Sequence, residues 1–226
     1  MREVVLDTET TGLNFKSGDR VIEVGCVELV NHIPSGITLQ FYCSTDKPIS
    51  PEAQKITGLT NEFLKKFSSF EDNSQSFLDF IKDDVLIIHN SDFDIGFLNN
   101  ELKILGKPKI TNKVINTVSL ARKKLNTRIA NLDYLCRRFS IDLSKRDLHG
   151  ALLDSHLLAD VYLELIGGKQ ISMNLSSNED NKKNNKKTAN LDKLNLSQIQ
   201  VTESQILEHK VIIKQIKNPL WEKIDY

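Results

Sequence analysis

Alternating apolar and polar positions near the start of the chain predict three strands. The short apolar run within residues 3–7 is typical of a buried strand, and residues 20–30 alternate with a period of two, as a half-buried strand does. Residues 37–43 alternate in the same way. A proline and a glycine lie within residues 31–36, so we expect a turn there that joins the last two strands into a hairpin.

Helical spacing then alternates with short apolar runs. Apolar residues recur at helical intervals in four segments: residues 73–82, 95–105, 132–139 and 149–166. Residues 84–89 hold a continuous apolar run, which is typical of a strand covered on both faces, and residues 114–120 fit another short strand. This order of elements predicts an α/β fold in which helices flank a mixed β-sheet.

The composition changes after residue 168. Residues 176–190 consist of Ser, Asn, Lys, Glu, Asp and Thr with a single Ala, so they cannot bury enough apolar surface to offset the entropy lost on ordering. We expect a disordered linker there and a flexible C-terminal extension. Apolar residues return in the tail, where residues 202–205 form a capping-box pattern ahead of a helix. The chain therefore divides into residues 1–168, 169–200 and 201–226.

Composition and charge narrow the function. Lys plus Arg and Asp plus Glu both total 30, so the formal net charge is zero and a strongly basic coat for nucleic acid is absent. Three widely spaced cysteines fit reduced thiols in a cytosolic protein. No apolar stretch approaches the ~20 residues that span a bilayer, and the first strand begins too early for a signal peptide. We therefore expect a cytoplasmic protein with no membrane contact.

Two acidic residues at the end of the first predicted strand indicate a metal site. Asp7 and Glu9 are two residues apart, so both carboxylates lie on one face of the strand. Buried carboxylates are costly unless a positive charge binds them. Hard oxygen ligands favour Mg²⁺ or Mn²⁺, and two such ions can hold the attacking and leaving oxygens of a phosphoryl displacement. Ordinary strand-end polarity is the alternative for an isolated Asp-x-Glu pair.

Three further residues extend this candidate site. Asp94 opens the helix after the second buried strand, where it would be either a metal ligand or the helix N-cap, and Asp92 is an alternative ligand that spacing does not exclude. Asp154, near the start of the last long helix, would complete the metal site. His149 would take a proton from water, because histidine titrates near neutral pH, although a lone His before a helix is more often a surface or capping residue.

The other basic and histidine residues have no assigned chemistry. His32, His89, His156 and His209 are interpreted as structural or solvated, with His156 close enough to the candidate site to keep in view. Basic residues gather at Arg122-Lys123-Lys124, Arg128, Arg137-Arg138 and Lys145-Arg146. They would line a path for the phosphates of a strand or form a solvated face, and both interpretations stay open.

Three motifs in order support a family resemblance: Asp7-Thr8-Glu9-Thr10-Thr11-Gly12, His89-Asn90-Ser91-Asp92-Phe93-Asp94-Ile95-Gly96-Phe97, and His149-Gly150-Ala151-Leu152-Leu153-Asp154. Jointly they resemble those of the four-acid, one-histidine 3′→5′ exonucleases, which have a ribonuclease H-like fold. More narrowly, the chain is similar to the proofreading epsilon subunits of bacterial DNA polymerase III. The resemblance covers residues 3 to about 175 and makes residues 1–168 the exonuclease domain.

The resemblance implies a role for each motif residue. It implies two divalent cations, Mg²⁺ or Mn²⁺, with Asp7 bridging both. Glu9 and Asp154 would complete the coordination of the first ion, Asp94 would serve the second, and His149 would be the general base. The implied substrate contacts are Asp7, Glu9, Thr10, Thr11, Gly12, Glu52, Thr57 and Asp154. Thr57 stands where epsilon-type relatives often carry His, which puts a base contact at this position in doubt.

The resemblance also implies partners. Residues 170–175 are similar to the sliding-clamp peptide of epsilon subunits, in which Gln170, Met173 and Leu175 would make the contacts, and a plain linker is the alternative. The tail from Val201 to Trp221 resembles the region that holds the polymerase catalytic subunit, and an exposed Trp221 would suit such an interface.

The expected activity is 3′→5′ proofreading. The enzyme would hydrolyse the terminal phosphodiester at the single-stranded 3′ end of DNA and release nucleoside 5′-monophosphates. Two alternatives remain: a mainly structural subunit that bridges the polymerase and the sliding clamp, and an exonuclease of the same family that trims RNA or short oligonucleotides.

Overall fold

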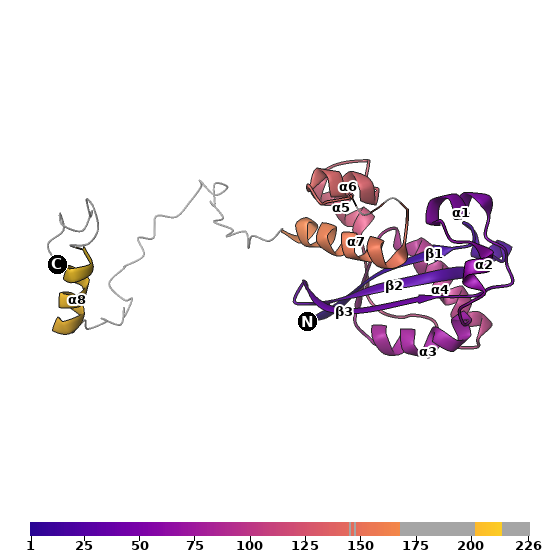
Figure 1. Cartoon of the computed structure of the whole chain (residues 1–226), viewed down its shortest axis with the longest axis horizontal. Helices are drawn as coiled ribbons and strands as arrows, with labels where there is room; N and C mark the ends of the chain where they lie inside the picture. The colour runs from indigo at the N-terminus through magenta and orange to yellow at the C-terminus, as the bar shows by residue number, and fades with distance from the viewer. Residues whose placement is uncertain (145, 147, 168–201, 214–226) are drawn as a thin grey trace, which may run out of the picture. The chain divides into compact units, whose positions relative to one another are not determined.

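The computed structural model describes residues 1–144, 146, 148–167 and 202–213, and Figure 1 shows the helices and strands that they form. The chain divides into two units, residues 1–174 and 175–226. The described part of the first unit is a β-sheet covered by helices, and it carries the three sequence motifs. The described part of the second unit is one helix.

A mixed five-stranded sheet forms the centre of the first unit, in the order β3-β2-β1-β4-β5. β1 pairs antiparallel with β2 and parallel with β4, and β4 pairs parallel with β5. The strands span Arg2–Thr10 (β1), Val21–Val30 (β2), Ile33–Tyr42 (β3), Val85–Ile88 (β4) and Val114–Asn116 (β5). The predicted mixed sheet is confirmed, and β1 continues past the expected end so that both Asp7 and Glu9 lie within the strand.

The turn between β2 and β3 is tighter than predicted. Only Asn31 and His32 separate the two strands, with φ values of 52° and 69°. Two consecutive residues with positive φ are typical of a tight hairpin turn, whose twist matches that of the flanking strands. The predicted turn over residues 31–36 is therefore wrong in its extent. The proline that suggested a longer turn lies in β3, an edge strand of the sheet, where proline is tolerated.

Helices cover both faces of this sheet. The described helices of the first unit are Pro51–Thr57 (α1), Asn61–Leu64 (α2), Phe70–Ile81 (α3), Ser91–Ile104 (α4), Thr117–Leu125 (α5), Leu132–Arg138 (α6) and Ala151–Ile166 (α7), with a 3₁₀ turn at Phe15–Ser17. The described helix of the second unit is Glu203–Ile213 (α8). Helical spacing predicted α3, α4, α6 and α7. It missed α1 and α2, which are too short for a clear apolar period, and the strand expected over residues 114–120 gives way to α5 after Asn116.

α4 begins four residues earlier than predicted. Its N-cap is Asn90, which has a φ of 62° and makes no side-chain capping hydrogen bond. Asp94 therefore lies inside the first turn of α4 instead of capping it. The interpretation of Asp94 as an N-cap is wrong, and its carboxylate is available for the site described below.

Two apolar cores lie on opposite faces of the sheet, because neighbouring strand residues point to opposite sides. Val5 of β1 packs with residues of α5, α6 and α7, whereas Val4 and Leu6 pack with residues of α3 and α4. Figure 1 shows α7 and α3 on opposite sides of the sheet. All three cysteines are free and buried, as their spacing predicted. The resulting three layers hold the ends of β1 and β4 in a fixed position between two sets of helices.

In the second unit, α8 follows Thr202. The side chain of Gln205 accepts hydrogen bonds from the Thr202 backbone N–H (2.9 Å) and hydroxyl (3.1 Å), which is one half of the predicted capping box. Leu207, Val211 and Ile212 of α8 are exposed. Among the described residues, no helix has both the length and the apolar character to cross a membrane.

Candidate active site

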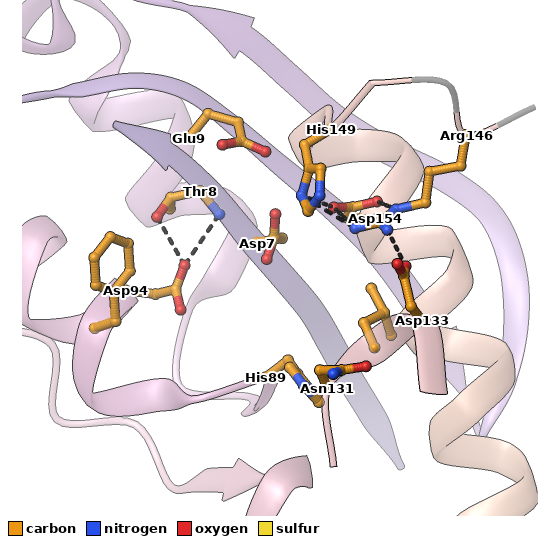
Figure 2. Close-up of a pocket in the computed structure, with 12 residues that line it drawn as sticks. Asp7, Thr8, Glu9, His89, Asp94, Asn131, Asp133, Arg146, His149 and Asp154 are labelled. Atoms are coloured by element: carbon orange, nitrogen blue, oxygen red, sulfur yellow. Dashed lines mark hydrogen bonds and ion pairs between the residues drawn. The ribbon is translucent and has the colours of Figure 1, made fainter. Parts of the chain in front are cut away.

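A pocket of about 310 Å³ opens beside the ends of the parallel strands β1 and β4. Open α/β sheets commonly bind ligands at this edge, where strand ends and helix N-termini meet. Figure 2 shows the residues that line it, and they include all five residues of the predicted metal and catalytic set: Asp7, Glu9, Asp94, His149 and Asp154. The fold therefore brings together side chains from β1, α4, α7 and the loop before α7.

β1 presents two of the carboxylates to the pocket. Asp7 and Glu9 are half-buried, while the alternation of the strand turns the side chain of Thr8 the other way. β1 pairs with both β2 and β4 up to Leu6 and with β2 alone at Asp7 and Glu9, so these residues lie just beyond the point where the strand is held on both sides. The spacing of two residues thus places both carboxylates on one face of β1, as the sequence predicted.

Asp94 is held in the pocket by β1. Its Oδ1 accepts hydrogen bonds from the Thr8 backbone N–H at 3.1 Å and from the Thr8 hydroxyl at 2.7 Å. The carboxylate of Asp94 is buried, whereas Asp92 is exposed and does not line the pocket. The structure therefore selects Asp94 over Asp92 as the candidate ligand.

α7 places Asp154 opposite Asp7 because the helix lies directly against β2. Gly25 of β2 pairs with Asp7, and a Cβ atom at Gly25 would lie 2.3 Å from the backbone carbon of Ala151 in α7. The Ser155 hydroxyl donates a hydrogen bond to the Gly25 carbonyl at 2.9 Å. Only glycine permits this approach, which brings the first turn of α7 to the pocket.

His149 lies at the rim of the pocket. Its backbone N–H donates to the Ile56 carbonyl at 3.1 Å, and its side chain is 46% exposed. The His149 Nδ1 atom lies 3.2 Å from Oδ2 of Asp154. One ligand atom each from Glu9, His149 and Asp154 lie within 4.8 Å of one another, a spacing that one divalent cation can bridge.

The buried carboxylates strongly affect one another. Burial, followed by repulsion from Asp94, raises the pKa of Asp7 well above its ordinary value. Burial and then repulsion from Asp154 raise the pKa of Glu9 to about 8. Burial also raises the pKa of Asp94 to about 7, although its hydrogen bonds from Thr8 oppose the shift. These groups are therefore poised to ionise when positive charge enters the pocket.

Arg146 supplies positive charge to this pocket. Its side chain is 7% exposed, and its Nε and Nη2 atoms donate to the two carboxylate oxygens of Asp154 at 2.6 and 2.7 Å. Its Nη1 atom donates to Asp133. Burial opposes the charge of Asp154, but the hydrogen bonds from Arg146 and then His149 outweigh it and lower the pKa of Asp154. The solvated-face interpretation is therefore wrong for Arg146.

A second pocket of about 480 Å³ adjoins the first and shares Thr8, Glu9 and Phe93 with it. Four of the predicted substrate contacts also line it: Thr10, Gly12, Glu52 and Thr57. The hydroxyl of Thr57 donates to a carbonyl of its own helix at 3.0 Å, so it is already engaged in local structure.

Thr11, the remaining predicted substrate contact, lines neither pocket. It is fully buried, and its hydroxyl accepts a hydrogen bond from the Arg20 backbone N–H at 3.0 Å. Its own backbone N–H donates to the Arg20 carbonyl at 2.9 Å. The side chain of Thr11 thus joins the end of β1 to the start of β2.

Comparison with known proteins identifies the family. The sequence profile of the Exonuclease family matches residues 4–162. The DNA polymerase III subunit epsilon of Rickettsia felis is 42% identical over 202 residues, which cover 83% of this chain and 88% of that protein. The subunit of the same name from Escherichia coli K12 is 42% identical over 176 residues, covering 74% and 72%. This chain belongs to the exonuclease family. It is a 3′→5′ exonuclease of the four-acid, one-histidine kind.

Solved structures share the fold of this exonuclease. The nuclease domain of 3′hExo bound to rAMP has a TM-score of 0.64 at 20% identity and covers 73% of this chain and 91% of that chain. Exonuclease X in complex with 5′ overhanging duplex DNA has a TM-score of 0.58 at 22% identity and covers 73% and 90%. The predicted ribonuclease H-like fold is confirmed.

The pocket of this exonuclease fits divalent cations that prefer oxygen ligands. The predicted site residues in it supply four carboxylates and one imidazole, and burial raises the pKa of Asp7, Glu9 and Asp94. Carboxylates gathered in this way need positive charge in order to ionise together. Oxygen-rich sites of this kind suit Mg²⁺ or Mn²⁺.

Four polar pocket residues were not assigned to the site from the sequence: Thr8, Asn131, Asp133 and His89, the last of which was interpreted as structural or solvated. His89 Nδ1 lies 2.9 Å from the Thr117 hydroxyl, and burial lowers the pKa of His89 to about 4, so the ring is neutral at physiological pH. Its place directly after β4, at the same sheet edge as the acidic residues, is the signal that would have found it. Asn131 and Asp133 carry no comparable signal, because the position of α6 depends on packing.

Several predictions fall outside the described residues. These are the partner contacts Gln170, Met173, Leu175 and Trp221 and the disordered linker over residues 176–190.

Proposed function

We propose that this exonuclease removes mispaired nucleotides from the 3′ end of a DNA strand during replication. The observation that carries the proposal is the convergence of four carboxylates and His149 on one pocket, beside a second pocket that would accept a nucleotide. The relatives named DNA polymerase III subunit epsilon support the setting in replication. Structures with the same fold bound to DNA or to rAMP support a nucleic-acid substrate.

The four carboxylates would hold two divalent cations, Mg²⁺ or Mn²⁺, with Asp7 shared between them and Glu9, Asp94 and Asp154 completing the two sites. When bound, two such ions stabilise both the attacking and the leaving oxygen of a phosphoryl displacement. The protein contributes positions set in advance, because Thr8 holds Asp94 and the packing of α7 holds Asp154.

His149 would act as the general base. Its exposed ring at the rim of the pocket can reach a water molecule that approaches the terminal phosphate. Attack by this water forms a new P–O bond and breaks the bond from phosphorus to the 3′ oxygen, while His149 receives the proton of the water. The phosphate stays with the departing nucleotide, so the product is a nucleoside 5′-monophosphate. The 3′ oxygen of the shortened strand takes a proton from solvent and becomes a 3′ hydroxyl.

The second pocket would hold the terminal nucleotide. The exposed side chains of Leu13 and Ile56 line it and offer apolar surface to a base, and Glu52 offers an acceptor for the 3′ hydroxyl. Phe93 lines both pockets and would separate the base from the scissile phosphate. A frayed, mispaired end supplies the single strand that such a pocket can accept, whereas a paired end must first unstack.

The test compares two substitutions that remove the same charge. Asp94→Asn alters the pocket, while Asp92→Asn alters an exposed residue of the same helix turn. We expect Asp94→Asn to lose at least about 10²-fold in the rate of shortening a single-stranded DNA oligonucleotide in Mg²⁺, as removal of preorganised electrostatic groups typically does, and Asp92→Asn to keep the wild-type rate. Equal rates for the two variants would contradict the proposed site.

Substrate class needs its own comparison. We expect faster shortening of a primer with a mispaired 3′ end than of a paired one, and release of nucleoside 5′-monophosphates seen by chromatography. Chelation of divalent cations by EDTA should stop the reaction. Faster degradation of a short RNA than of DNA of the same sequence would favour the oligonucleotide-trimming alternative.

We also propose two protein partners, the polymerase catalytic subunit for the tail and the sliding clamp for residues 170–175. The exposed apolar side chains of α8 support an interface in the tail. A subunit that served only to bridge the two partners would have no need of the pocket residues.

A further inference from the structure

Arg146 binds the two carboxylate oxygens through which Asp154 would coordinate a metal ion. Both carboxylate oxygens of Asp154 accept hydrogen bonds from this one guanidinium, at 2.6 and 2.7 Å. A guanidinium and a metal cation both bind a carboxylate through its oxygen lone pairs. Figure 2 shows the Arg146 side chain beside His149 and Asp154 in the pocket. A cation held by Glu9 and Asp154 would therefore compete with Arg146 for Asp154.

The same guanidinium has a second hydrogen-bond partner, Asp133, which is not one of the four predicted metal ligands. Its Nη1 atom, which Asp154 does not use, donates to Asp133 at the start of α6. Asp133 is 45% exposed, so it lies at the edge of the pocket and not at its buried centre. Arg146 can release Asp154 and still keep a charge-assisted hydrogen bond to Asp133.

This arrangement differs from that of neighbouring basic residues. Arg137 and Arg138 at the end of α6 are exposed, and Arg138 donates a 3.4 Å hydrogen bond to the Tyr134 hydroxyl. Arg146 instead is nearly buried and bonded to two carboxylates. Its charge is thus directed at the pocket, where three other carboxylates gather.

We propose that Arg146 is a placeholder cation, which compensates the charge of Asp154 in the metal-free protein and yields Asp154 to a divalent cation while staying bonded to Asp133. The proposal rests on the proposed metal-binding role of the pocket. Arg146 is then a positioning residue that keeps the carboxylates together before the metal binds. The alternative is that Arg146 permanently orients Asp154 for the metal. Removal of Arg146 would raise the affinity for the metal ion if Arg146 is a placeholder, and would lower it if Arg146 is a permanent support.

Titration calorimetry of Mg²⁺ and of Mn²⁺ into the full chain, without substrate, separates these roles. Arg146→Met keeps most of the apolar stem but removes the competing charge. We expect it to bind the cation about tenfold more tightly than the wild type, because a charge-assisted pair of hydrogen bonds no longer has to be released. We expect Arg138→Met, the matched control, to leave the dissociation constant unchanged.

A second variant covers the case in which Arg146→Met does not fold without metal. Arg146→Lys keeps one positive charge but loses the two-pronged contact with Asp154, so we expect a smaller increase in cation affinity. We also expect thermal denaturation in EDTA to show a lower midpoint for Arg146→Met than for the wild type, since Asp154 would lose its countercharge. Weaker or unchanged cation binding in the folded variants would overturn the placeholder role.

The result also separates this inference from the proposed function. A wild-type protein that binds neither Mg²⁺ nor Mn²⁺ would refute the metal site itself. A wild-type protein that binds them with the same affinity as the Arg146 variants would refute the placeholder role alone.

Discussion

At the scale of single residues, this protein concentrates negative charge where water cannot fully solvate it. Burial raises the pKa of Asp7, Glu9 and Asp94, and the repulsion from neighbouring carboxylates adds to the shift for Asp7 and Glu9. Asp154 behaves in the opposite way because Arg146 is bonded to it. The pocket therefore holds three groups that resist ionisation and one that is already compensated.

These shifts predict how the stability of the metal-free protein depends on pH. Glu9 and Asp94 have higher pKa values in the folded than in the unfolded chain, so their contribution to stability is complete below about pH 4 and is lost as pH rises through about 7 to 8. The pKa of Asp7 is shifted in the same direction. In EDTA, we expect the melting temperature to fall between pH 5 and pH 8. The lowered pKa of Asp154 affects stability only at more acidic pH.

Divalent cations should reverse this loss by binding the ionised carboxylates. We therefore expect Mg²⁺ or Mn²⁺ to raise the melting temperature more at pH 8 than at pH 6, as differential scanning fluorimetry would show. Asp7→Asn removes one of the three groups and should flatten the slope in EDTA. A melting temperature in EDTA that does not vary over this range would show that the three carboxylates ionise without destabilising the folded protein.

At the scale of elements, one close contact between α7 and β2 sets the geometry of the site. Gly25 allows the backbone of α7 to approach the sheet, and the Ser155 hydroxyl bonds to the Gly25 carbonyl. Because Gly25 pairs with Asp7, this contact also sets the distance between the carboxylates of Asp7 and Asp154.

A single methyl group at Gly25 tests this contact. Gly25→Ala would place a Cβ atom 2.3 Å from backbone atoms of α7, which side-chain motion cannot relieve. We expect a loss of at least about 2 kcal/mol in unfolding free energy, in the range of overpacking, and a fall in nuclease activity as Asp154 moves away.

The matched control is Gly150→Ala at the N-cap of α7. A Cβ atom there meets nothing within 4 Å, and the φ of −152° is open to any residue. We expect a smaller loss of stability, measured by urea denaturation. If Gly25→Ala were as stable as Gly150→Ala, α7 would not be seated as closely as the structure indicates.

At the scale of the whole molecule, the candidate active site and the proposed partner-binding surface belong to different units. The pocket residues all come from the first unit, whereas α8 in the second unit exposes Leu207, Val211 and Ile212. Exposed apolar side chains spaced along one helix are typical of a surface that docks into a partner's groove. The proposed partner for this surface is the polymerase catalytic subunit.

Substitutions in the full chain separate nuclease activity from binding to the polymerase catalytic subunit. We expect Leu207→Asp combined with Val211→Asp to weaken binding to the polymerase catalytic subunit at least about tenfold in a pull-down or interferometry assay, because two apolar side chains would lose their burial. Degradation of single-stranded DNA should be unchanged. Lys210→Ala, on the same helix, is the control for a general effect on α8. Undiminished binding by the double variant would place the interface elsewhere.

The sequence predicted the parts of this site that follow from local pattern. The spacing of Asp7 and Glu9 implies a shared strand face, and the three motifs together indicated the family. The extent of the first hairpin turn and the start of α4 were wrong, because both depend on pairing and packing that local pattern does not contain. Asp94 was consequently placed as a possible cap, although it lies inside the helix.

What the sequence determined by itself was the chemistry available: the acidic residues, the histidine and the order in which strands and helices carry them. Only the tertiary structure decided which groups meet. It chose Asp94 over Asp92, brought His89 into the pocket and directed Arg146 at Asp154. The physical reason is that burial, repulsion and countercharge depend on distances between segments far apart in the chain, and those distances exist only after the helices have packed on the sheet.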